Sequence, residues 1–418
     1  MSLNDLYTKK QIEVLKETQK SDWFMLINHG AKRSGKTILN NDLFLMELMR
    51  VRKIADTLGI ATPMYILAGV SSKTIQNNIL TEIYNKYGIT FKFDKHGSFN
   101  FKGVKIVQAY TGTIAGLGGI RGMTAFGAYI NEASLAKQEV FKEIISRCSG
   151  EGARILVDTN PDNPKHWLLN EYINNSDANI LSFKYSLDDN TFLGERYIKN
   201  IKANTPQGIF YQRDILGNWV AGEGVIYKSF ADNVTKFETE KSFNFETINI
   251  GVDFGSNKSK HAFCCTGITK GYKELIALAS EKHEPDTPEK LNEQFIVFVK
   301  KMLYKYGRID CIYCDSAEQV LIRGMQKALQ DNNLNIAIKN AIKNEIINRI
   351  RIVNVLMTTS RFFYVKNENT SLVDALQSAV WDSKSLEDKR LDDNTSDIDT
   401  LDSFEYSFEK YIKVLSMI

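Results

Sequence analysis

Residues 30–37 have the spacing of a phosphate-binding loop, Gly-x-x-x-x-Gly-Lys-Thr. Backbone N–H groups of such a loop surround the phosphates of a nucleotide, and its glycines permit the close approach. We expect Lys36 to neutralise the β- and γ-phosphates and Thr37 to offer its hydroxyl to Mg²⁺. The loop residues predicted to bind nucleotide are Gly30, Arg33, Ser34, Gly35, Lys36 and Thr37.

The segments on either side of this loop support the prediction. Residues 23–28 form a short apolar run, which is typical of a buried parallel strand. Residues 37–50 carry spaced apolar side chains without a helix breaker and predict a helix. The N-terminus of that helix would direct its positive dipole end at the phosphates.

A polar pair after a second apolar run could complete a nucleotide-hydrolysing site. Residues 125–130 predict a strand, and Asn131 and Glu132 follow it. We expect Glu132 to act as the base or to orient the attacking water. At the position of Asn131, an aspartate commonly orients Mg²⁺ in such a site. The neutral amide of Asn131 can still hold a metal-bound water.

Three further groups could join the nucleotide. Thr159 and Asn160 follow the strand predicted at residues 155–157, and polar groups at the carboxyl ends of parallel strands face the ligand. Arg121 lies in a glycine-rich segment, from which a guanidinium could reach a transferring phosphate or simply be solvated. Gln11 follows a polar N-terminal segment and could hydrogen-bond to adenine.

The second half of the chain carries well-spaced aspartates. Asp253 ends one predicted strand, Asp315 ends another, and Asp402 begins the last predicted helix, with Asp399 three residues earlier on the same face. Converging carboxylates repel one another unless cations lie between them, and hard oxygen ligands suit Mg²⁺ or Mn²⁺. Two such ions could clamp an in-line attack on a phosphodiester. Taken singly, each aspartate could instead end a strand or cap a helix.

The elements that must position these residues differ between the two halves. In the first half, strand-like and helix-like segments alternate, which predicts a parallel sheet covered by helices. In the second half, residues 247–253, 261–267 and 273–280 predict an antiparallel meander, followed by a helix capped by Thr287 and a strand at 309–314. We therefore predict one domain at residues 1–216, a glycine-bearing linker at 217–245 and a second domain at 246–418.

Composition limits the function further. Of the 418 residues, 43% are hydrophobic and 25% are charged, as in ordinary globular proteins. No N-terminal signal pattern and no apolar run of about 20 residues is present, so we expect no membrane span. The net charge of +3 does not by itself predict a nucleic-acid partner, although the positive excess lies in residues 1–220.

Together these motifs resemble those of the large terminase subunits of tailed bacteriophages. The resemblance extends over nearly the whole chain. It depends on the joint order of the phosphate loop, the Arg121 segment, the Asn131–Glu132 pair, the Thr159–Asn160 pair, the glycine-bearing linker and the three spaced aspartates. It implies an α/β protein with an N-terminal P-loop, ASCE-type ATPase domain and a C-terminal ribonuclease H-like, mixed-sheet nuclease domain.

The resemblance also implies roles for individual residues. Glu132 would be the catalytic glutamate, Gln11 the adenine contact, and Arg121, or its rival Arg33, an arginine finger. Thr159 and Asn160 would couple hydrolysis to movement. Asp253, Asp315 and Asp402 would hold the nuclease metal. Asn131 departs from the common aspartate, and the ligand role of Asp399 stays open.

A terminase would package DNA. ATP and Mg²⁺ (or Mn²⁺) would be its cofactors, and its partners would be double-stranded viral DNA, a portal protein, a small terminase subunit and further copies of itself in a ring on the procapsid. It would work in the host cytoplasm and need no membrane. Two alternatives stay open: a helicase or remodelling ATPase whose second domain binds nucleic acid without cleaving it, and a non-catalytic adaptor on the portal.

Overall fold

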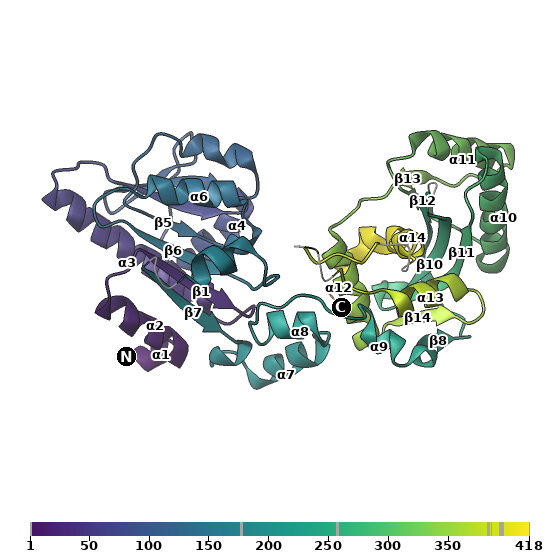
Figure 1. Ribbon diagram of the computed structural model, residues 1–418, viewed down its shortest axis with the longest axis horizontal. Helices are drawn as coiled ribbons and strands as arrows, with labels where there is room; N and C mark the ends of the chain where they lie inside the picture. The colour runs from purple at the N-terminus through teal and green to yellow at the C-terminus, as the bar shows by residue number, and fades with distance from the viewer. Residues whose placement is uncertain are drawn as a thin grey trace. The chain divides into compact units, whose positions relative to one another are not determined.

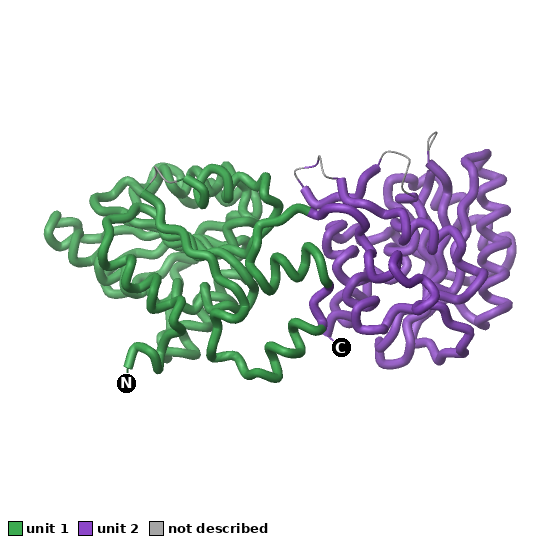
Figure 2. Tube along the Cα trace, turned by 60° about the horizontal axis from the view of Figure 1, so that its bottom comes forward, with its two compact units in different colours: residues 1–203, 207–221 green, residues 204–206, 222–418 purple. Residues whose placement is uncertain are grey.

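The computed structural model describes residues 2–175, 179–255, 259–382, 385, 387–392 and 397–417. The chain divides into two compact units, coloured separately in Figure 2. The first comprises residues 1–203 and 207–221, and the second comprises residues 204–206 and 222–418.

The first unit contains a seven-stranded sheet in the order β3-β4-β2-β5-β6-β1-β7. Neighbouring strands are parallel except for the β3–β4 pair at one edge. The strands are β1 (Met25–Gly30), β2 (Met64–Gly69), β3 (Phe99–Phe101), β4 (Val104–Tyr110), β5 (Gly127–Ile130), β6 (Arg154–Thr159) and β7 (Ile180–Tyr185).

Helices cover both faces of this sheet (Figure 1). Alternate residues of β1 divide between two apolar cores: Leu26 packs in the core that holds α3, whereas Ile27 packs in the core that holds α6. A π-helical turn at Gln76–Leu80 joins α4 to α5. The helices are α1 (Leu3–Leu6), α2 (Lys9–Lys20), α3 (Lys36–Thr57), α4 (Ser72–Ile75), α5 (Thr81–Tyr87), α6 (Gln138–Arg147), α7 (Glu195–Asn204) and α8 (Ile209–Asp214).

The second unit contains a mixed seven-stranded sheet in the order β13-β12-β9-β10-β11-β14-β8. The antiparallel meander predicted from the sequence is confirmed as β9–β10–β11, and the flanking strands pair in parallel. The strands are β8 (Glu238–Thr239), β9 (Phe245–Asp253), β10 (His261–Thr269), β11 (Leu275–His283), β12 (Cys311–Cys314), β13 (Ile338–Asn340) and β14 (Phe362–Val365).

The two faces of this second sheet carry different helices. The predicted helix after Thr287 is confirmed: Thr287 accepts a hydrogen bond from the Lys290 N–H at 3.3 Å, and Pro288 occupies the first turn. This helix, α10, packs with α11 against one face. The helices are α9 (Lys228–Ala231), α10 (Pro288–Tyr306), α11 (Gln319–Asp331), α12 (Ile346–Thr358), α13 (Thr370–Ser378), α14 (Ile398–Phe408) and α15 (Ile412–Leu415).

Helix α14 lies against the other face and approaches β9 very closely. A Cβ on Gly251 would clash with the carbonyl oxygen of Ser403, so only glycine fits at this point of the strand. Because side chains alternate along a strand, Asp253 emerges on the same face as Gly251. The close approach therefore brings the aspartates of α14 near the end of β9.

The predicted domain boundaries at residues 216 and 246 stay predictions. Within residues 217–245, α9 and β8 belong to the second unit, and β8 pairs with β14. No helix in the described part of the chain combines the length and the hydrophobicity needed to cross a membrane.

Candidate active sites

The phosphate loop runs from the end of β1 into the first turn of α3. Its two terminal glycines adopt positive φ angles, 132° at Gly30 and 92° at Gly35, which a side chain would disfavour. Arg33 has φ 59° and is exposed, and its carbonyl oxygen accepts a hydrogen bond from Asn190 at 2.7 Å. The sequence prediction of a strand, a loop and a helix is confirmed here.

Lys36 is buried inside this loop. Its ammonium donates to the carbonyl oxygens of Gly30 at 2.9 Å and Ala31 at 2.6 Å, and to the Ser34 hydroxyl at 3.3 Å. Burial lowers the pKa of Lys36 to about 8, whereas the nearby carboxylates of Asp158 and Glu132 favour its charged form. A phosphate in the loop would replace these carbonyl contacts with charge-assisted ones.

Gln11 connects α2 to the loop. Its side-chain carbonyl accepts from the Thr8 N–H at 2.8 Å, and its amide donates to the Gly35 carbonyl at 2.9 Å. The side chain is buried. The adenine contact predicted for Gln11 stays a prediction, but the structure places this residue against the loop rather than away from it.

The predicted strand end after β5 lies beside the loop. Ile130 of β5 pairs in register with Val157 of β6, so Asn131 and Asp158 follow side by side. The amide nitrogen of Asn131 donates to Asp158 Oδ1 at 2.7 Å, and its oxygen accepts from Asn78 at 3.0 Å. Asn131 is therefore fixed at both ends of its amide.

Glu132 is half-buried and adopts a left-handed backbone conformation with φ 55°. Its N–H donates to Asp158 Oδ1 at 3.2 Å, which holds this unusual turn. Burial raises the pKa of Glu132, the Asp158 carboxylate raises it further, and Lys32 and Lys36 oppose both effects. A raised pKa suits a group that must accept a proton.

Thr159 and Asn160 end β6, the strand next to β1. The Thr159 hydroxyl accepts from the Ser134 N–H at 2.9 Å, and Asn160 Oδ1 accepts from the Lys36 ammonium at 3.3 Å. The structure thus brings Asn160 to the phosphate loop, as a phosphate-sensing role requires. Arg121 lies on an exposed loop after a 3₁₀ turn.

Asp158 is the residue that sequence reasoning missed in this unit. It is buried at the end of β6 and accepts from Tyr129 OH at 2.6 Å in addition to Asn131 and the Glu132 N–H. Burial raises its pKa, and these hydrogen bonds and Lys36 oppose the shift. The signal was present, since an aspartate one residue before Thr159 falls at the same strand end.

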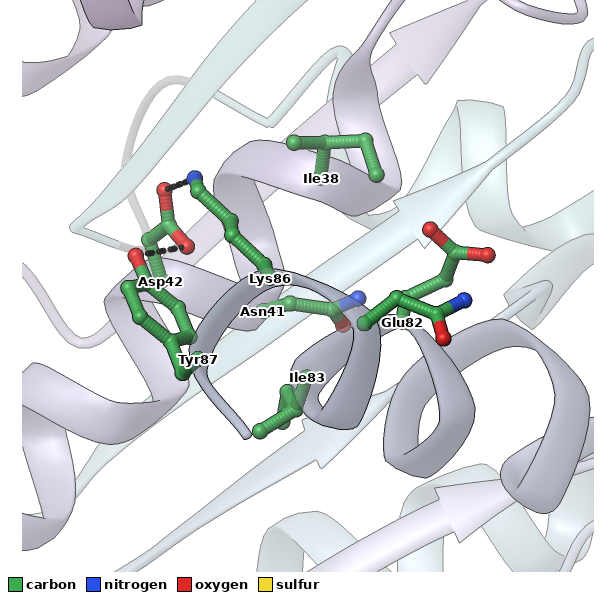
Figure 3. A pocket seen from close by; sticks show the side chains of 8 residues that line it. Ile38, Asn41, Asp42, Glu82, Ile83, Lys86 and Tyr87 are labelled. Carbon is green, nitrogen blue, oxygen red and sulfur yellow. Dashed lines mark hydrogen bonds and ion pairs between the residues drawn. The ribbon is translucent and has the colours of Figure 1, made fainter. Parts of the chain in front are cut away.

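A pocket between α3 and α5 was also not predicted. Figure 3 shows Asp42 of α3 bonded to Lys86 and Tyr87 of α5, at 2.6 and 2.8 Å. The pocket has a volume of about 280 Å³, and Ile38, in the first turn of α3, lines it as well. None of the predicted site residues lines this pocket.

In the second unit the predicted aspartates share one face of the sheet. Asp315 directly follows β12, which pairs in parallel with β9, and its N–H donates to the carbonyl of Val252 at 3.1 Å. Helix α14 begins at Ile398 rather than at Asp402, so Asp399 lies in its first turn and Asp402 one turn later. This corrects the sequence expectation that Asp402 starts the helix.

The pKa of Asp253 reflects the carboxylates around it. Burial raises its pKa well above the usual range, and the carboxylates of Asp402, Asp399 and Asp315 raise it further, in that order. Lys343 opposes these effects. Among the described residues, however, no three His, Cys, Asp or Glu side chains are arranged as a ready-made metal site.

The other three carboxylates are held by partners of their own. Asp315 forms an ion pair with Lys343, and Asp399 Oδ2 accepts from the Lys260 N–H at 2.7 Å. Asp402 pairs with two buried guanidiniums, Arg349 at 3.1 Å and Arg390 at 3.0 Å. The donor set of hard oxygens suits Mg²⁺ or Mn²⁺, but a cation that bridged these carboxylates would have to compete with existing partners.

Glu405 anchors the two arginines. It is fully buried one turn after Asp402 and pairs with Arg390 and, at 3.0 Å, with Arg349. Tyr227 donates to the same carboxylate at 3.3 Å. A buried and multiply bonded network of this kind fixes the position of Asp402, since removing one partner would leave a charge unpaired.

Lys343 is positioned by its backbone. It adopts a left-handed conformation with φ 56°, and its N–H donates to Glu409 Oε1 at 2.8 Å. The next N–H, from Asn344, donates to the second oxygen of the same buried carboxylate at 3.0 Å. This clamp fixes the Lys343 backbone, and the Lys343 ammonium forms an ion pair with Asp315.

We expect replacement of Asp253 by asparagine to stabilise the metal-free protein. The buried carboxylate forms no ion pair among the described residues and faces three other carboxylates, so removing its charge should increase the free energy of unfolding by about 1 to 3 kcal/mol. The melting temperature at neutral pH, compared with that of Asp331→Asn on the exposed end of α11, measures this gain.

The pH dependence of this gain has a defined sign. Because the pKa of Asp253 is raised in the folded protein, its favourable contribution is fully present below the pKa of the unfolded chain and is lost as pH rises through the folded value. The asparagine variant should therefore surpass the wild type near neutral pH and lose its advantage below about pH 3. An equal advantage at both pH values would contradict the explanation.

Comparisons with known proteins agree with this arrangement. Residues 28–232 match the family described as terminase large subunit, T4likevirus-type, N-terminal. No curated protein sequence matches the chain.

Among solved structures, the large terminase of a thermophilic bacteriophage is similar over almost the whole chain. Its crystal form 2 superposes with a TM-score of 0.76 at 22% sequence identity, covering 96% of this chain and 98% of that chain. Its complex with ADP has a TM-score of 0.75 at 22% identity and covers 99% and 100%. Its complex with ATP-γ-S has a TM-score of 0.73 at 22% identity and covers 96% and 99%.

Proposed function

Because residues 28–232 belong to the large-terminase N-terminal family and the whole chain has the large-terminase fold, we propose that this protein is a viral DNA-packaging motor. Its first unit hydrolyses ATP to move double-stranded DNA into a procapsid. Its second unit cuts the DNA concatemer with a metal-dependent nuclease. The observation that carries the proposal is the convergence of Lys36, in the first turn of α3, with Glu132 and Asn160, which follow the neighbouring parallel strands β5 and β6.

In the first unit, different residues would bind the phosphates, accept the proton of the attacking water and respond to loss of the γ-phosphate. Loop N–H groups, Lys36 and Ser34 would bind the phosphates, and Thr37 and Asn131 would hold Mg²⁺ and its water, which shields the phosphate charge. Glu132 accepts the proton of the attacking water. Asn160, which already contacts Lys36, and Thr159 respond to loss of the γ-phosphate.

The second unit would hold its metal at the face shared by β9, β12 and α14. Asp253, Asp315 and Asp402 supply the ligands, with Asp399 as a fourth candidate. Mg²⁺ or Mn²⁺ bound there would polarise the phosphodiester and activate a water. The arginines behind Asp402 keep its carboxylate oriented, and Lys343 must give way, or remain beside the scissile phosphate as a second cation.

The proposal extends to partners and location. The motor would act as a ring of identical subunits on a procapsid in the host cytoplasm, with a portal protein and a small terminase subunit. The exposed guanidinium of Arg121, or that of Arg33, would act as the arginine finger, either on its own nucleotide or on that of a neighbouring subunit. Gln11 would contact adenine.

A Glu132→Gln variant tests the ATPase half of the proposal. It should retain nucleotide binding, because the loop and Lys36 are untouched, yet lose at least about a hundredfold in phosphate release because the base is removed. Glu139→Gln, on the exposed face of α6, is the matched control. Equal rates in the wild type, Glu132→Gln and Lys36→Ala would exclude a motor and favour a nucleotide-binding adaptor.

A translocating ATPase with a non-cleaving second unit is a second candidate. It is favoured by the basic groups that already pair with Asp315 and Asp402. Plasmid nicking by the wild-type protein in the presence of Mg²⁺ or Mn²⁺ separates the two candidates. Nicking that stops with a chelator supports the packaging nuclease, and an absence of nicking supports the non-cleaving candidate.

A further inference from the structure

We propose that Asp158 supplies the negative charge that the strand-end pair Asn131–Glu132 lacks, and that it acts as a positioning residue for Glu132 and for the Mg²⁺ that accompanies the nucleotide. The inference deepens the proposed ATPase function and rests on it. Asp158 lies at the end of β6, whereas the sequence motif, the Asn131–Glu132 pair, follows the neighbouring strand β5.

The first step is the complementarity of Asn131 and Asp158. Their side chains approach to 2.7 Å with the amide nitrogen as donor and the carboxylate oxygen as acceptor. An aspartate at position 131 would instead place two carboxylates at this distance, which is strongly unfavourable in a buried site. The amide on β5 and the carboxylate on β6 therefore form a matched pair, in which the charge lies one strand away from its usual place.

The second step is the contact between Asp158 and the turn that carries Glu132. Asp158 Oδ1 accepts from the Glu132 N–H at 3.2 Å, and this residue is the one with the left-handed backbone. Tyr129 OH donates to the other carboxylate oxygen at 2.6 Å. The Asp158 carboxylate is thus fixed by three donors: the Asn131 amide, the Glu132 N–H and the Tyr129 hydroxyl. Because one of these donors is the Glu132 backbone, the carboxylate also fixes the direction in which Glu132 leaves the sheet.

The third step is the position of Asp158 relative to the phosphates. Asp158 lies two residues before Asn160, whose side chain accepts from the Lys36 ammonium at 3.3 Å, and Lys36 also donates to the Gly30 carbonyl at 2.9 Å. Asp158 therefore lies close to the strand end that contacts Lys36 and is bonded directly to the Asn131 amide. A purely structural carboxylate would satisfy the same hydrogen bonds but would not affect the requirement for Mg²⁺.

The test moves the charge back to its usual strand. We compare Asp158→Asn, Asn131→Asp and the double variant, using the full chain and a fluorescent ADP analogue titrated with and without Mg²⁺, together with phosphate release as a function of Mg²⁺ concentration. Glu139→Gln, on the exposed face of α6, is the control, since it removes one carboxylate without touching Asp158. Thermal melting identifies any variant that fails to fold.

Asp158→Asn should reduce the Mg²⁺-dependent gain in ADP affinity about tenfold and raise the Mg²⁺ concentration needed for half-maximal hydrolysis by a similar factor. Asn131→Asp should also be impaired, because it sets two carboxylates against each other. The double variant should recover at least about threefold relative to Asp158→Asn, and Glu139→Gln should keep the wild-type Mg²⁺ dependence.

Two results would overturn the inference: an Asp158→Asn variant with wild-type Mg²⁺ dependence, or a folded double variant no better than Asp158→Asn. Failure of the proposed function would look different, because the wild type itself would then release no more phosphate than Lys36→Ala.

Discussion

Replacement of Lys36 by alanine is expected to abolish ATP hydrolysis and to leave metal-dependent DNA cleavage unchanged. The Lys36 ammonium is the buried cation of the phosphate loop, and it also contacts Asn160. Alanine removes this charge from the site where phosphate charge accumulates, so turnover should fall at least about a hundredfold to a thousandfold. Phosphate release and plasmid nicking, measured on the same preparation, check both parts of the prediction.

The expected independence of cleavage follows from the division of the chain into two units, each with its own sheet and apolar core. Lys20→Ala, an exposed lysine at the end of α2 that pairs with Glu17, is the matched control and should leave both activities intact. Loss of cleavage in a Lys36→Ala variant that melts like the wild type would show that the two units do not work separately.

The second large effect is expected at Asp253. Asp253→Asn should lose cleavage by about a thousandfold, because the buried carboxylate at the end of β9 is the proposed ligand that has no competing ion pair among the described residues. ATP hydrolysis should be unchanged. The variant is also predicted to be more stable than the wild type without metal, so loss of cleavage in it cannot be attributed to unfolding.

Divalent cations provide a readout for this variant that does not depend on activity. Mg²⁺ or Mn²⁺ should raise the melting temperature of the wild type, since a ligand that binds the folded state stabilises it, and should raise that of Asp253→Asn much less. Asp331→Asn should respond like the wild type. Equal cation-induced shifts in all three proteins would show that the ions bind elsewhere.

The main elements of the fold were predictable because local patterns in their sequences show which residues are buried and where a helix begins. The strands of the first unit that flank the phosphate loop are apolar runs buried on both faces, and α10 carries its cap, its proline and its apolar stripe in order. Several strands at or near the edges of the two sheets were not predicted. β7 consists mostly of half-exposed residues, while β8, β13 and β14 contain only two to four residues and are defined by partners far away in sequence.

In the candidate sites, too, the residues of local sequence motifs were predicted, and those whose role depends on the tertiary structure were not. The phosphate loop and the Asn131–Glu132 pair are local motifs, and the structure brings both to one edge of the sheet. Asp158 escaped notice because its role depends on the register between β5 and β6. The cations around the second site, Lys343 and Arg390 among them, come from segments that no local pattern connects to the aspartates.

The central claim is that one chain joins a nucleotide hydrolase to a metal-dependent nuclease, and the nuclease half depends on metal binding at the second site. Crystals of the wild-type protein soaked in Mn²⁺ test that half most directly through anomalous scattering. We predict a Mn²⁺ peak bound by Asp253 together with Asp315 or Asp402, and displacement of the Lys343 ammonium from Asp315. Data that show Mn²⁺ at the phosphate loop but none within ligand distance of Asp253 would contradict the account and leave an ATPase whose second unit does not cut.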